Sequence, residues 1–373
     1  MDTLKTLKQK LTEQSIVFKA NEDLSAHSTM RVTAYASLFI EISDIETLKK
    51  ILNILQSNPV KFLIIGDGSN TLFSKDFEGL VLKMNIKGKE IIEENDEYVL
   101  FKVGAGESWH EFVEYCVNRN LAGNENLAYI PGTVGAAPIQ NIAAYGQVQE
   151  DTFESLEAIN IKTGEIKVFN KEECEFAYRK SVFKTKYKGE YIVLSVNYKL
   201  YKVEEYIPET SYHSRYESLQ GELEQIAKKT YTLKDVFNAV VSIRKKKLPQ
   251  IEEEGTLGSF FLNPFVTKEK LEQLQKKFPD IQFYPVEKMQ YPGRDDEILK
   301  ASSIVKIPAG WLLEELGWRG KFEGNVGSSP KHALCVVTKG PAKGEDVINF
   351  IEKMKKSVED ATGIKLETEI NIV

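Results

Sequence analysis

A loop of small residues from Ile130 to Gln147 constrains this chain more than any other stretch. It holds three glycines and four alanines, and Pro131 and Pro138 fix the backbone angle φ at two points. Glycine costs conformational entropy on folding, so a run of this kind needs a reason. A stiff loop with a bare backbone lets a large flat or charged cofactor approach the main chain. A tight crossing of packed elements is the alternative, and for this loop alone it is the simpler explanation.

Two further glycine turns precede this loop. Lys61–Ile65 is a short apolar run typical of a buried strand, and Gly66-Asp67-Gly68-Ser69-Asn70 follows it directly. Gly104–Ser108 follows a second predicted strand and opens a helix. Such turns form anion-binding nests or plain hairpin corners, and neither has the G-x-G-x-x-G pattern of a Rossmann fold. Three glycine loops within about eighty residues nevertheless indicate one ligand shared by several backbone turns.

Helices and strands are mixed along the whole chain, which predicts an α+β fold. Helical spacing of apolar residues predicts helices over residues 4–11, 45–55, 109–116, 232–247, 267–278 and 344–361. Strand patterns cover residues 61–65, 79–84, 98–103, 155–161, 192–200, 333–337 and 365–373, the last with Leu366, Thr368, Ile370 and Ile372 on one face. Residues 201–231 lack a pattern and predict a long loop. A chain of 373 residues predicts two or three domains.

Charge and cysteine content exclude several classes of protein. The formal net charge is −6 with basic and acidic residues interspersed, which argues against nucleic acid or an anionic membrane as the partner. No stretch approaches the roughly 20 apolar residues of a membrane span, and residues 1–5 lack a signal-peptide pattern. Cys116, Cys174 and Cys335 are too far apart for a disulfide framework or a metal clamp. We therefore expect a cytoplasmic protein without a bound metal.

Five motifs in a fixed order carry a resemblance to a known family. They are the turn at residues 66–70, the loop at residues 130–147, Tyr178–Lys184, Gly258–Pro264 and Leu366–Glu369. Together they make the chain resemble the UDP-N-acetylenolpyruvoylglucosamine reductases, from about Ser28 to Glu369. These flavoenzymes, also called UDP-N-acetylmuramate dehydrogenases, complete the UDP-N-acetylmuramate precursor of peptidoglycan. The resemblance is to their type I branch.

The resemblance implies a vanillyl-alcohol-oxidase-type (PCMH-type) FAD-binding fold of two subdomains, followed by an α+β substrate-binding domain. Residues 1–75 would form the first FAD-binding subdomain, 76–230 the second and 231–363 the substrate domain. A terminal strand at about 364–373 would return to the first subdomain, and residues 201–231 would form the lid loop of the type I branch. The stretch between Val286 and Lys306 is longer than in close relatives. We expect a monomer that binds a small sugar nucleotide.

The family's reaction implies roles for three residues. Hydride passes from NADPH to FAD and then to C3 of the enolpyruvyl ether of UDP-N-acetylglucosamine, while a proton is delivered to C2. By resemblance, Arg179 holds the substrate carboxylate, where negative charge accumulates, with a bidentate guanidinium. Glu369 cooperates there, and we expect it to be protonated because a second carboxylate would repel the substrate. Ser259 matches the family's proton donor to C2.

The resemblance also implies binding residues. Lys247 and Asn263, twelve residues before and four residues after Ser259, would hold the substrate diphosphate. Tyr216 and Tyr284 would cover that diphosphate, and Tyr178 belongs to the same site. His332 stands where relatives carry a polar diphosphate contact, although a surface histidine is the simpler explanation. The residues expected to hold FAD lie in the first two motifs and are Gly66, Asp67, Gly68, Ser69, Asn70, Pro131, Gly132, Thr133, Gly135, Ala136, Gln140, Asn141, Ala143, Tyr145 and Gly146.

Ala143 departs from the family, which commonly has N-I-G-A-Y-G where this chain has N-I-A-A-Y-G. A methyl group is tolerable there unless the residue needs a positive φ, in which case the affinity for flavin would fall. Two alternative functions stay open. The first is another FAD-dependent oxidase or dehydrogenase of the same superfamily, with His27 or His110 as the candidates for covalent flavin attachment. The second is a sensor that binds flavin or sugar nucleotide without catalysis.

Overall fold

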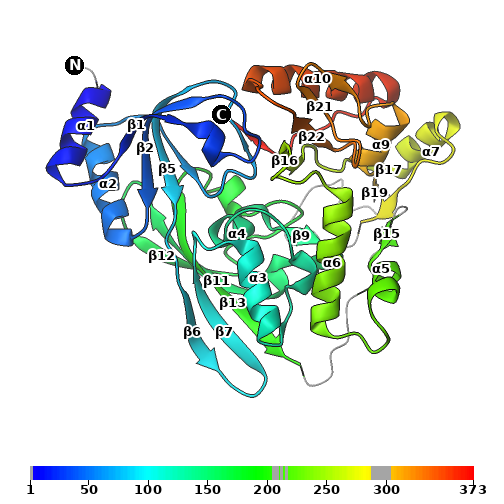
Figure 1. The fold of residues 1–373 in the computed structure, drawn as a ribbon, viewed down its shortest axis with the longest axis horizontal. Coiled ribbons are helices and arrows are strands. Elements are labelled where there is room, and N and C mark those ends of the chain that lie inside the picture. Colours follow the sequence, from blue (N-terminus) through cyan, green and yellow to red (C-terminus); the bar gives the residue numbers. More distant parts are fainter. Residues whose placement is uncertain (1–2, 204–209, 211–212, 215–216, 287–303) are drawn as a thin grey trace. The chain divides into compact units, whose positions relative to one another are not determined.

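The computed structural model describes residues 3–203, 210, 213–214, 217–286 and 304–373 (Figure 1). The chain divides into two compact units, each assembled from three separate segments. The first unit comprises Met1–Asn21, Ser37–Asp67 and Glu78–Lys245, and the second comprises Glu22–Ala36, Gly68–Phe77 and Lys246–Val373. The boundaries predicted from the family resemblance, which assign three continuous domains, stay a prediction.

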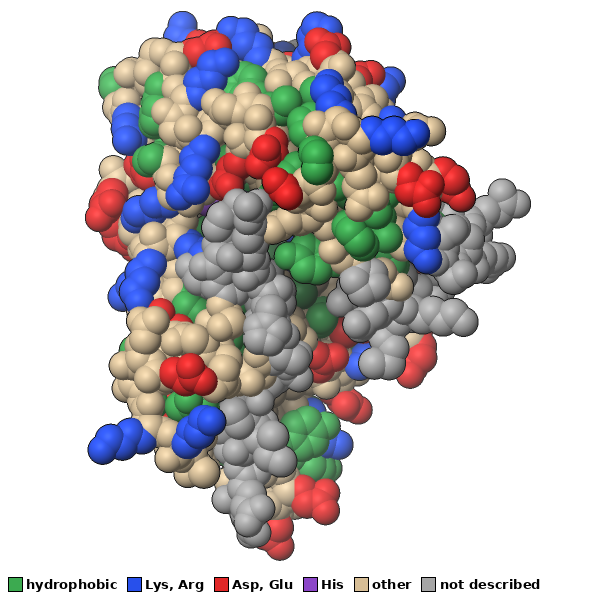
Figure 2. All heavy atoms as spheres, turned by 90° about the vertical axis from the view of Figure 1, so that its right-hand side faces the viewer, with side chains coloured by type: hydrophobic (Ala, Val, Ile, Leu, Met, Phe, Trp, Pro, Cys, Tyr) green, Lys and Arg blue, Asp and Glu red, His purple; other side chains and the backbone are tan. Residues whose placement is uncertain are grey.

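The surface carries charges of both signs. On the face drawn in Figure 2, basic and acidic side chains are interspersed among the described residues rather than separated by sign. Within the described part of the chain, no helix is both long enough and apolar enough to cross a membrane. Cys116, Cys174 and Cys335 are all free thiols and all buried.

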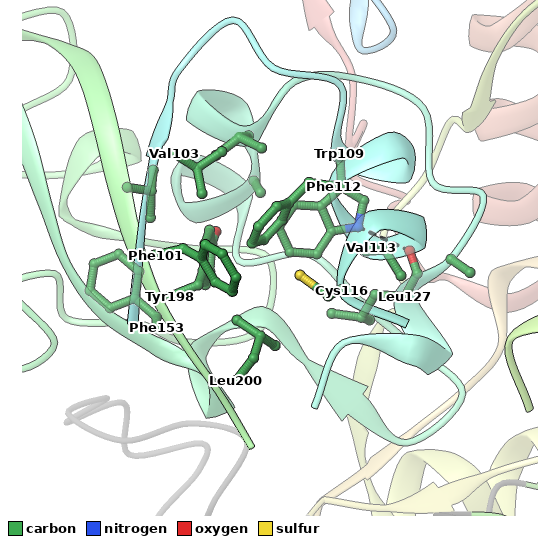
Figure 3. Packing of buried hydrophobic residues seen from close by; sticks show 14 of the residues in the cluster. Phe101, Val103, Trp109, Phe112, Val113, Cys116, Leu127, Phe153, Tyr198 and Leu200 are labelled. Atoms are coloured by element: carbon green, nitrogen blue, oxygen red, sulfur yellow. Dashed lines mark hydrogen bonds between the residues drawn. The ribbon is translucent and has the colours of Figure 1, made fainter. Parts of the chain in front are cut away.

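An antiparallel sheet forms the centre of the first unit. Its strand order is β12 (Ile166–Asn170), β11 (Phe153–Asn160), β13 (Tyr191–Lys202), β7 (Tyr98–Gly104) and β6 (Lys89–Glu94), and the short β8 (Leu121–Ala122) also pairs with β13. Ser108 caps the start of helix α3 (Trp109–Asn118), because its hydroxyl accepts the amide of Glu111. Phe101, Phe112 and Tyr198 pack together between this sheet and α3 (Figure 3). The adjacent Trp109 donates its indole N–H to the Leu127 carbonyl at 3.0 Å.

A second, four-stranded sheet has the order β1 (Lys19–Asp23), β2 (Tyr35–Ile42), β5 (Phe77–Met84) and β3 (Phe62–Ile65). The apolar faces of helices α1 (Thr3–Glu13) and α2 (Ile45–Ser57) bury Leu11 and Leu52 in one cluster with Leu82 of this sheet. Asp44 caps α2 as its position predicts, because its carboxylate accepts the Thr47 amide at 2.7 Å.

Among its described residues, the second unit contains two small sheets of three or four strands, the pair formed by β4 (Thr71–Leu72) and β23 (Asn371–Ile372), and three α-helices. One sheet has the order β16 (Gly255–Ser259), β22 (Cys335–Thr338), β21 (Val326–Ser328) and β20 (Phe322–Glu323), and the other has the order β17 (Phe265–Thr267), β19 (Ile304–Lys306) and β18 (Tyr284–Pro285). The helices are α7 (Lys268–Lys277), α9 (Ala309–Glu315) and α10 (Gly344–Thr362). Trp311 and Trp318 are buried against Phe278 and Phe350, so these tryptophans are core residues, as Trp109 is in the first unit.

Two sequence-based predictions of secondary structure are wrong in part. Residues 201–231 are not a continuous loop, because helix α5 (Leu219–Ile226) buries Leu219 and Leu223 in the core of the first unit. The end of the chain is not one long strand: only β23 (Asn371–Ile372) forms, parallel to β4 (Thr71–Leu72), and Ile372 is exposed. Tyr216 and residues 287–303, which cover most of the longer stretch, lie outside the described residues.

Candidate functional site

The three glycine loops predicted from the sequence do meet in the first unit. A side chain at Gly66 would place its Cβ 2.6 Å from the Thr133 hydroxyl, and one at Gly135 would lie 2.6 Å from the Cβ of Ala105. The amides of Trp109 and Val134 donate to the carbonyls of Gly132 and Glu107 at 3.0 and 2.8 Å. Close loop crossing is therefore the reason for glycine at positions 66 and 135, as the simpler explanation predicted.

Few residues of the small-residue loop are fully exposed. Within residues 131–146, only Pro131, Ala136 and Gly146 are exposed, and none carries a polar side chain. Asp67 is also exposed, but enough protein surrounds its carboxyl group that desolvation raises its pKa against the opposing effect of Lys83 and Lys87. A stiff surface of this kind suits a ligand with phosphates and flat rings, so the residues fit FAD.

The end of the small-residue loop is a two-residue hairpin. Strands β9 (Ala143–Ala144) and β10 (Gln147–Val148) pair around Tyr145 and Gly146, which have φ values of 48° and 89°. Positive φ at both central residues defines a type I′ turn. Ala143 is not among the residues with positive φ, so its methyl group does not meet the condition that would weaken flavin binding.

A second tight turn presents Arg179. Ala177 and Lys180 exchange two backbone hydrogen bonds at 3.1 and 3.0 Å, which leaves Tyr178 and Arg179 as the turn residues. Arg179 has a φ of 54°, a left-handed conformation that costs energy for any residue with a Cβ. Its guanidinium lies 5.4 Å from the centre of the Tyr178 ring and donates from Nη2 to the Ala143 carbonyl at 3.0 Å. The predicted carboxylate-binding residue thus contacts the predicted flavin loop directly.

Buried side chains fix the Arg179 turn to the loop. Asn141 donates from Nδ2 to the Ala177 carbonyl at 3.2 Å, and the Ser181 hydroxyl donates to the Ile139 carbonyl at 2.7 Å. Asn141 is itself oriented by Gln149, whose Nε2 donates to its Oδ1 at 3.0 Å. Gln149 in turn accepts the Tyr198 hydroxyl at 2.9 Å, and both residues are fully buried.

Sequence reasoning missed Gln149 and Tyr198. The only signal was a tyrosine at an inward position of the alternating strand 192–200, where a buried hydroxyl needs a partner. It also missed Glu125 and Asn126, which stabilise the type I′ turn: Asn126 donates to the Tyr145 carbonyl and Glu125 accepts from Gln147, both at 2.7 Å. The polar run Asn124-Glu125-Asn126 before Leu127 was the available sign.

In the second unit, Ser259 and Glu369 lie on paired segments. The Glu369 amide donates to the Phe260 carbonyl at 2.9 Å, and the Leu262 amide donates to the Glu367 carbonyl at 2.9 Å. Ser259 is the last residue of β16. Asn70, from the first glycine turn, donates to the Glu369 carbonyl at 3.4 Å. The structure therefore brings together the segments that carry the predicted proton donor, the predicted acid and part of the predicted FAD turn.

In the second unit, the first glycine turn leaves no room for a side chain at position 68. Gly68 has a φ of 64°, and a Cβ there would overlap the His27 carbonyl oxygen. The Thr29 amide donates to the Gly68 carbonyl at 3.4 Å, and Ser28 donates through its hydroxyl to the Thr71 carbonyl at 2.8 Å. Gly68 is therefore required both for its conformation and for this close approach.

Two predicted substrate contacts have defined hydrogen bonds. Asn263 accepts the Ala309 amide through Oδ1 at 2.9 Å, so its Nδ2 group is the part that could donate a hydrogen bond to a ligand. His332 accepts the Leu334 amide through Nδ1 at 3.2 Å, which assigns its proton to Nε2. Burial lowers the His332 pKa, and Lys247 and Arg319 add to this effect while Glu314 opposes it. His332 is therefore a neutral donor rather than the surface histidine that was the simpler explanation.

The other predicted contacts are distributed between the two units. Lys247 is the last residue of α6 (Leu233–Lys247), so the predicted basic helix end is present. Tyr284 lies in β18, opposite Lys306 of β19, and is partly buried. Arg179 and Tyr178 belong to the first unit, whereas Lys247, Ser259, Asn263, Tyr284, His332 and Glu369 belong to the second.

Comparison with known families identifies the class of protein to which the crossed loops and the mixed fold belong. Residues 36–170 match the model of the FAD binding domain, so the chain is a flavoprotein. Residues 250–373 match the C-terminal domain of UDP-N-acetylenolpyruvoylglucosamine reductase. The chain belongs to the UDP-N-acetylenolpyruvoylglucosamine reductase family.

Curated relatives and a solved structure agree with this assignment. The reductase of Flavobacterium johnsoniae is 41% identical over 355 residues, covering 95% of this chain and 99% of the relative. The reductase of Amoebophilus asiaticus is 39% identical, with coverage of 95% and 98%. The crystal structure of the Thermus caldophilus reductase superimposes with a TM-score of 0.62 at 20% identity, covering 96% of this chain and 98% of that one, and so supports the fold.

Proposed function

We infer that this protein is an FAD-containing, NADPH-dependent oxidoreductase that reduces UDP-N-acetylglucosamine enolpyruvate to UDP-N-acetylmuramate, a precursor of peptidoglycan. The observation that carries this proposal is the pairing of the Ser259 and Glu369 segments through the Glu369 amide and the Phe260 carbonyl. This pairing brings the segments of Ser259 and Glu369 side by side, which supports the proposed roles of Ser259 as proton donor and Glu369 as acid. Full-length similarity to named reductases supports the same substrate.

The residues of the crossed loops hold the cofactor. Residues 66–70 and 131–146 present main-chain groups and small side chains to the flavin, and the loop crossings described above fix their shape. When bound, FAD supplies the hydride that it has taken from NADPH. Because the loop surface is stiff before any ligand binds, little conformational entropy is lost on binding.

Three side chains act on the substrate itself. Arg179 holds the carboxylate of the enolpyruvyl group with a charged fork that matches two oxygens. Hydride addition at C3 builds carbanion character at C2, which is delocalised into this carboxylate, so the same contact strengthens as charge develops. Glu369, protonated, donates a hydrogen bond to the carboxylate. Ser259 delivers its proton to C2 and recovers one from solvent.

The remaining residues bind the sugar nucleotide. Lys247 contributes a positive charge to the diphosphate, and Asn263 contributes Nδ2 because its Oδ1 already accepts the Ala309 amide. His332 offers a neutral Nε2–H, as its Nδ1 accepts the Leu334 amide. Tyr178, Tyr216 and Tyr284 complete the proposed site. We further propose a cytoplasmic monomer, which static light scattering of the purified protein would test.

The function is tested by an anaerobic visible spectrum. The flavin absorption band should disappear when NADPH is added and return when UDP-N-acetylglucosamine enolpyruvate follows. Return of the band only with oxygen would favour another oxidase or dehydrogenase of the superfamily. Absence of any bleaching by NADPH would favour a sensor. Acid precipitation adds a control, because flavin that stays with the pellet would indicate covalent attachment through His27 or His110.

A further inference from the structure

Strand β16 contains an irregularity just before Ser259. Gly255 and Thr256 pair with Thr338 and Val337 of β22, but Ser259 pairs with Cys335. Three steps along β16 thus correspond to two steps along β22, so one extra residue is inserted. Gly258 has a φ of 72°, the conformation of a glycine in a β-bulge. Because side chains alternate along a strand, the extra residue decides on which face the Ser259 hydroxyl emerges.

A single hydroxyl group bonds to backbone groups of both strands at the bulge. Thr256 donates through Oγ1 to the Val336 carbonyl at 3.0 Å and accepts the Gly258 amide at 3.2 Å. Val336 is the β22 residue between the partners of Thr256 and Ser259, so this carbonyl faces the inserted residue. Thr256 is 3% exposed, where an unpaired donor or acceptor is costly.

The backbone of Thr256 is fixed from its other side. Its amide donates to the Thr29 carbonyl at 2.8 Å, and its carbonyl accepts the Thr29 hydroxyl at 2.6 Å. Downstream of the bulge, the Phe260 amide donates to the Leu334 carbonyl at 3.1 Å. The bulge is therefore held between two fixed points, and the Thr256 hydroxyl is the side-chain group that spans it.

We propose that Thr256 is a positioning residue for Ser259: its hydroxyl stabilises the Gly258 bulge that directs the Ser259 hydroxyl toward the substrate. The proposal rests on the proposed function, in which Ser259 gives its proton to C2. Thr256 does not contact the substrate and takes no part in the transfer itself. It follows that the two half-reactions depend on it differently, because hydride transfer from NADPH does not use Ser259.

The experiment compares Thr256→Val with Thr256→Ser. Valine has the shape of threonine but lacks the hydroxyl, whereas serine retains the hydroxyl. By stopped-flow absorbance, NADPH should reduce the flavin of both variants at a rate similar to that of the unsubstituted protein. Reoxidation by the enolpyruvyl substrate should be about 100-fold slower in Thr256→Val, the effect of misplacing a reacting group by about 1 Å. It should be close to normal in Thr256→Ser, and only Thr256→Val should show a larger solvent deuterium isotope effect.

Two further measurements keep the proposal open to refutation. Hydrogen exchange in the flavin-free protein should be faster over residues 255–261 in Thr256→Val than in Thr256→Ser. Gly258→Ala serves if Thr256→Val does not fold, because no described atom lies within 4 Å of the position of the added Cβ and only the φ of 72° is disturbed. It should show the same selective loss of reoxidation.

The outcomes separate this proposal from the proposed function. Equal slowing of both half-reactions in Thr256→Val, or normal reoxidation in Gly258→Ala, would overturn the role of Thr256. Failure of the unsubstituted protein to be reduced by NADPH or reoxidised by the substrate would instead overturn the proposed function.

Discussion

Arg179 combines a proposed function that needs a long charged side chain with a backbone conformation that favours glycine. Its φ of 54° belongs to the left-handed region, where a Cβ is strained. Strain of this kind is typical of functional sites, and Arg179 also contacts the predicted flavin loop. The strained conformation persists because surrounding hydrogen bonds hold it in place. Here those bonds come from Ala177, Lys180 and Asn141.

The strain at Arg179 predicts a difference between two substitutions. Arg179→Gly and Arg179→Ala both remove the guanidinium and its bond to Ala143, so both should lose turnover with the enolpyruvyl substrate. Only glycine adopts a positive φ without strain. The free energy of unfolding should therefore be about 1 kcal/mol higher for Arg179→Gly than for Arg179→Ala. Urea denaturation of the two variants measures this difference. Equal stability would mean that the turn relaxes to a negative φ when the side chain is shortened.

Glu369 gives a second prediction at this scale. If Glu369 acts as a protonated donor, Glu369→Gln should retain much of the activity, because an amide donates in the same place. Glu369→Ala should lose it by at least about 100-fold, the usual worth of one positioned donor in a catalytic site. Glu367→Gln is the matched control, since Glu367 is exposed two residues away and should behave as the unsubstituted protein. Steady-state turnover decides, and an inactive Glu369→Gln would contradict the role.

The proposed site residues could be named from the sequence only through their motifs, and their roles stay predictions. Ser259, Asn263 and Glu369 do lie on neighbouring segments, and Arg179 does contact the predicted flavin loop. Their conformations were not predictable, because the positive φ of Arg179 and the bulge at Gly258 depend in part on hydrogen bonds to Asn141 and Val336, which are far away in the sequence. A local pattern carries no information about such partners.

Among the elements, strand β13 is linked to the small-residue loop by the buried Tyr198 hydroxyl, which bonds to Gln149, and Gln149 in turn bonds to Asn141 of the loop. Tyr198→Phe removes the donor to Gln149 and leaves a buried amide oxygen unpaired. The free energy of unfolding should fall by about 1–3 kcal/mol. Tyr201→Phe, on the same strand but 45% exposed, should stay within about 0.5 kcal/mol of the unsubstituted protein. Urea denaturation of both variants measures the contrast, and equal values would show that Gln149 finds another donor.

Elements with strong periodicity were correctly predicted, whereas those defined by distant partners were not. Helices α2, α3 and α10 follow from the spacing of their apolar residues and, for α2 and α3, their caps. The end of the chain shows the limit. Its alternation does bury Leu366 and Ile370, but Glu367 and Glu369 bond to the Phe260 segment while Asn371 bonds to Asn70. A change of partner after two residues prevents one continuous strand.

Helix α5 shows the opposite limit. Residues 219–226 have too few turns to be recognised by periodicity, and an isolated helix of this length is unstable in water. It forms because Leu219 and Leu223 are buried in a core whose other members lie outside this helix. Tertiary packing, which sequence patterns do not contain, decides this element.

For the whole molecule, the two partly buried histidines His110 and His332 predict how stability depends on pH. Burial lowers the pKa values of His110 and His332 below the ordinary 6.5. Between that value and their lower folded-state pKa values, the unfolded chain binds protons that the folded chain does not. Stability therefore rises with pH through this window and is unaffected by these groups above it, with a slope of at most about 1.4 kcal/mol per pH unit for each histidine.

Variants isolate this contribution. Asp67 and Glu150, whose pKa values burial raises, act in the opposite sense, so the total slope alone is not decisive. His110→Asn and His332→Asn keep an acceptor for the Tyr129 and Leu334 amides but do not titrate. Denaturation between pH 5 and pH 8 should give a shallower dependence in each variant than in the unsubstituted protein. An unchanged dependence would mean that these histidines titrate alike in the folded and unfolded chains.

The division of each unit among separate segments determines the order in which the protein can be completed on the ribosome. The first unit has all of its residues once Lys245 has been synthesised, but the second unit combines Glu22–Ala36 and Gly68–Phe77 with Lys246–Val373. Gly255 and Gly344 pack so closely on the backbone of Met30 and Phe73 that neither early segment is covered until these residues emerge. At about 5–20 residues per second, roughly 15 to 60 s separate Phe77 from Val373. Until Gly255 and Gly344 emerge within that interval, Met30 and Phe73, which are buried in the folded protein, lack these partners, and this gives a chaperone a defined window in which to bind.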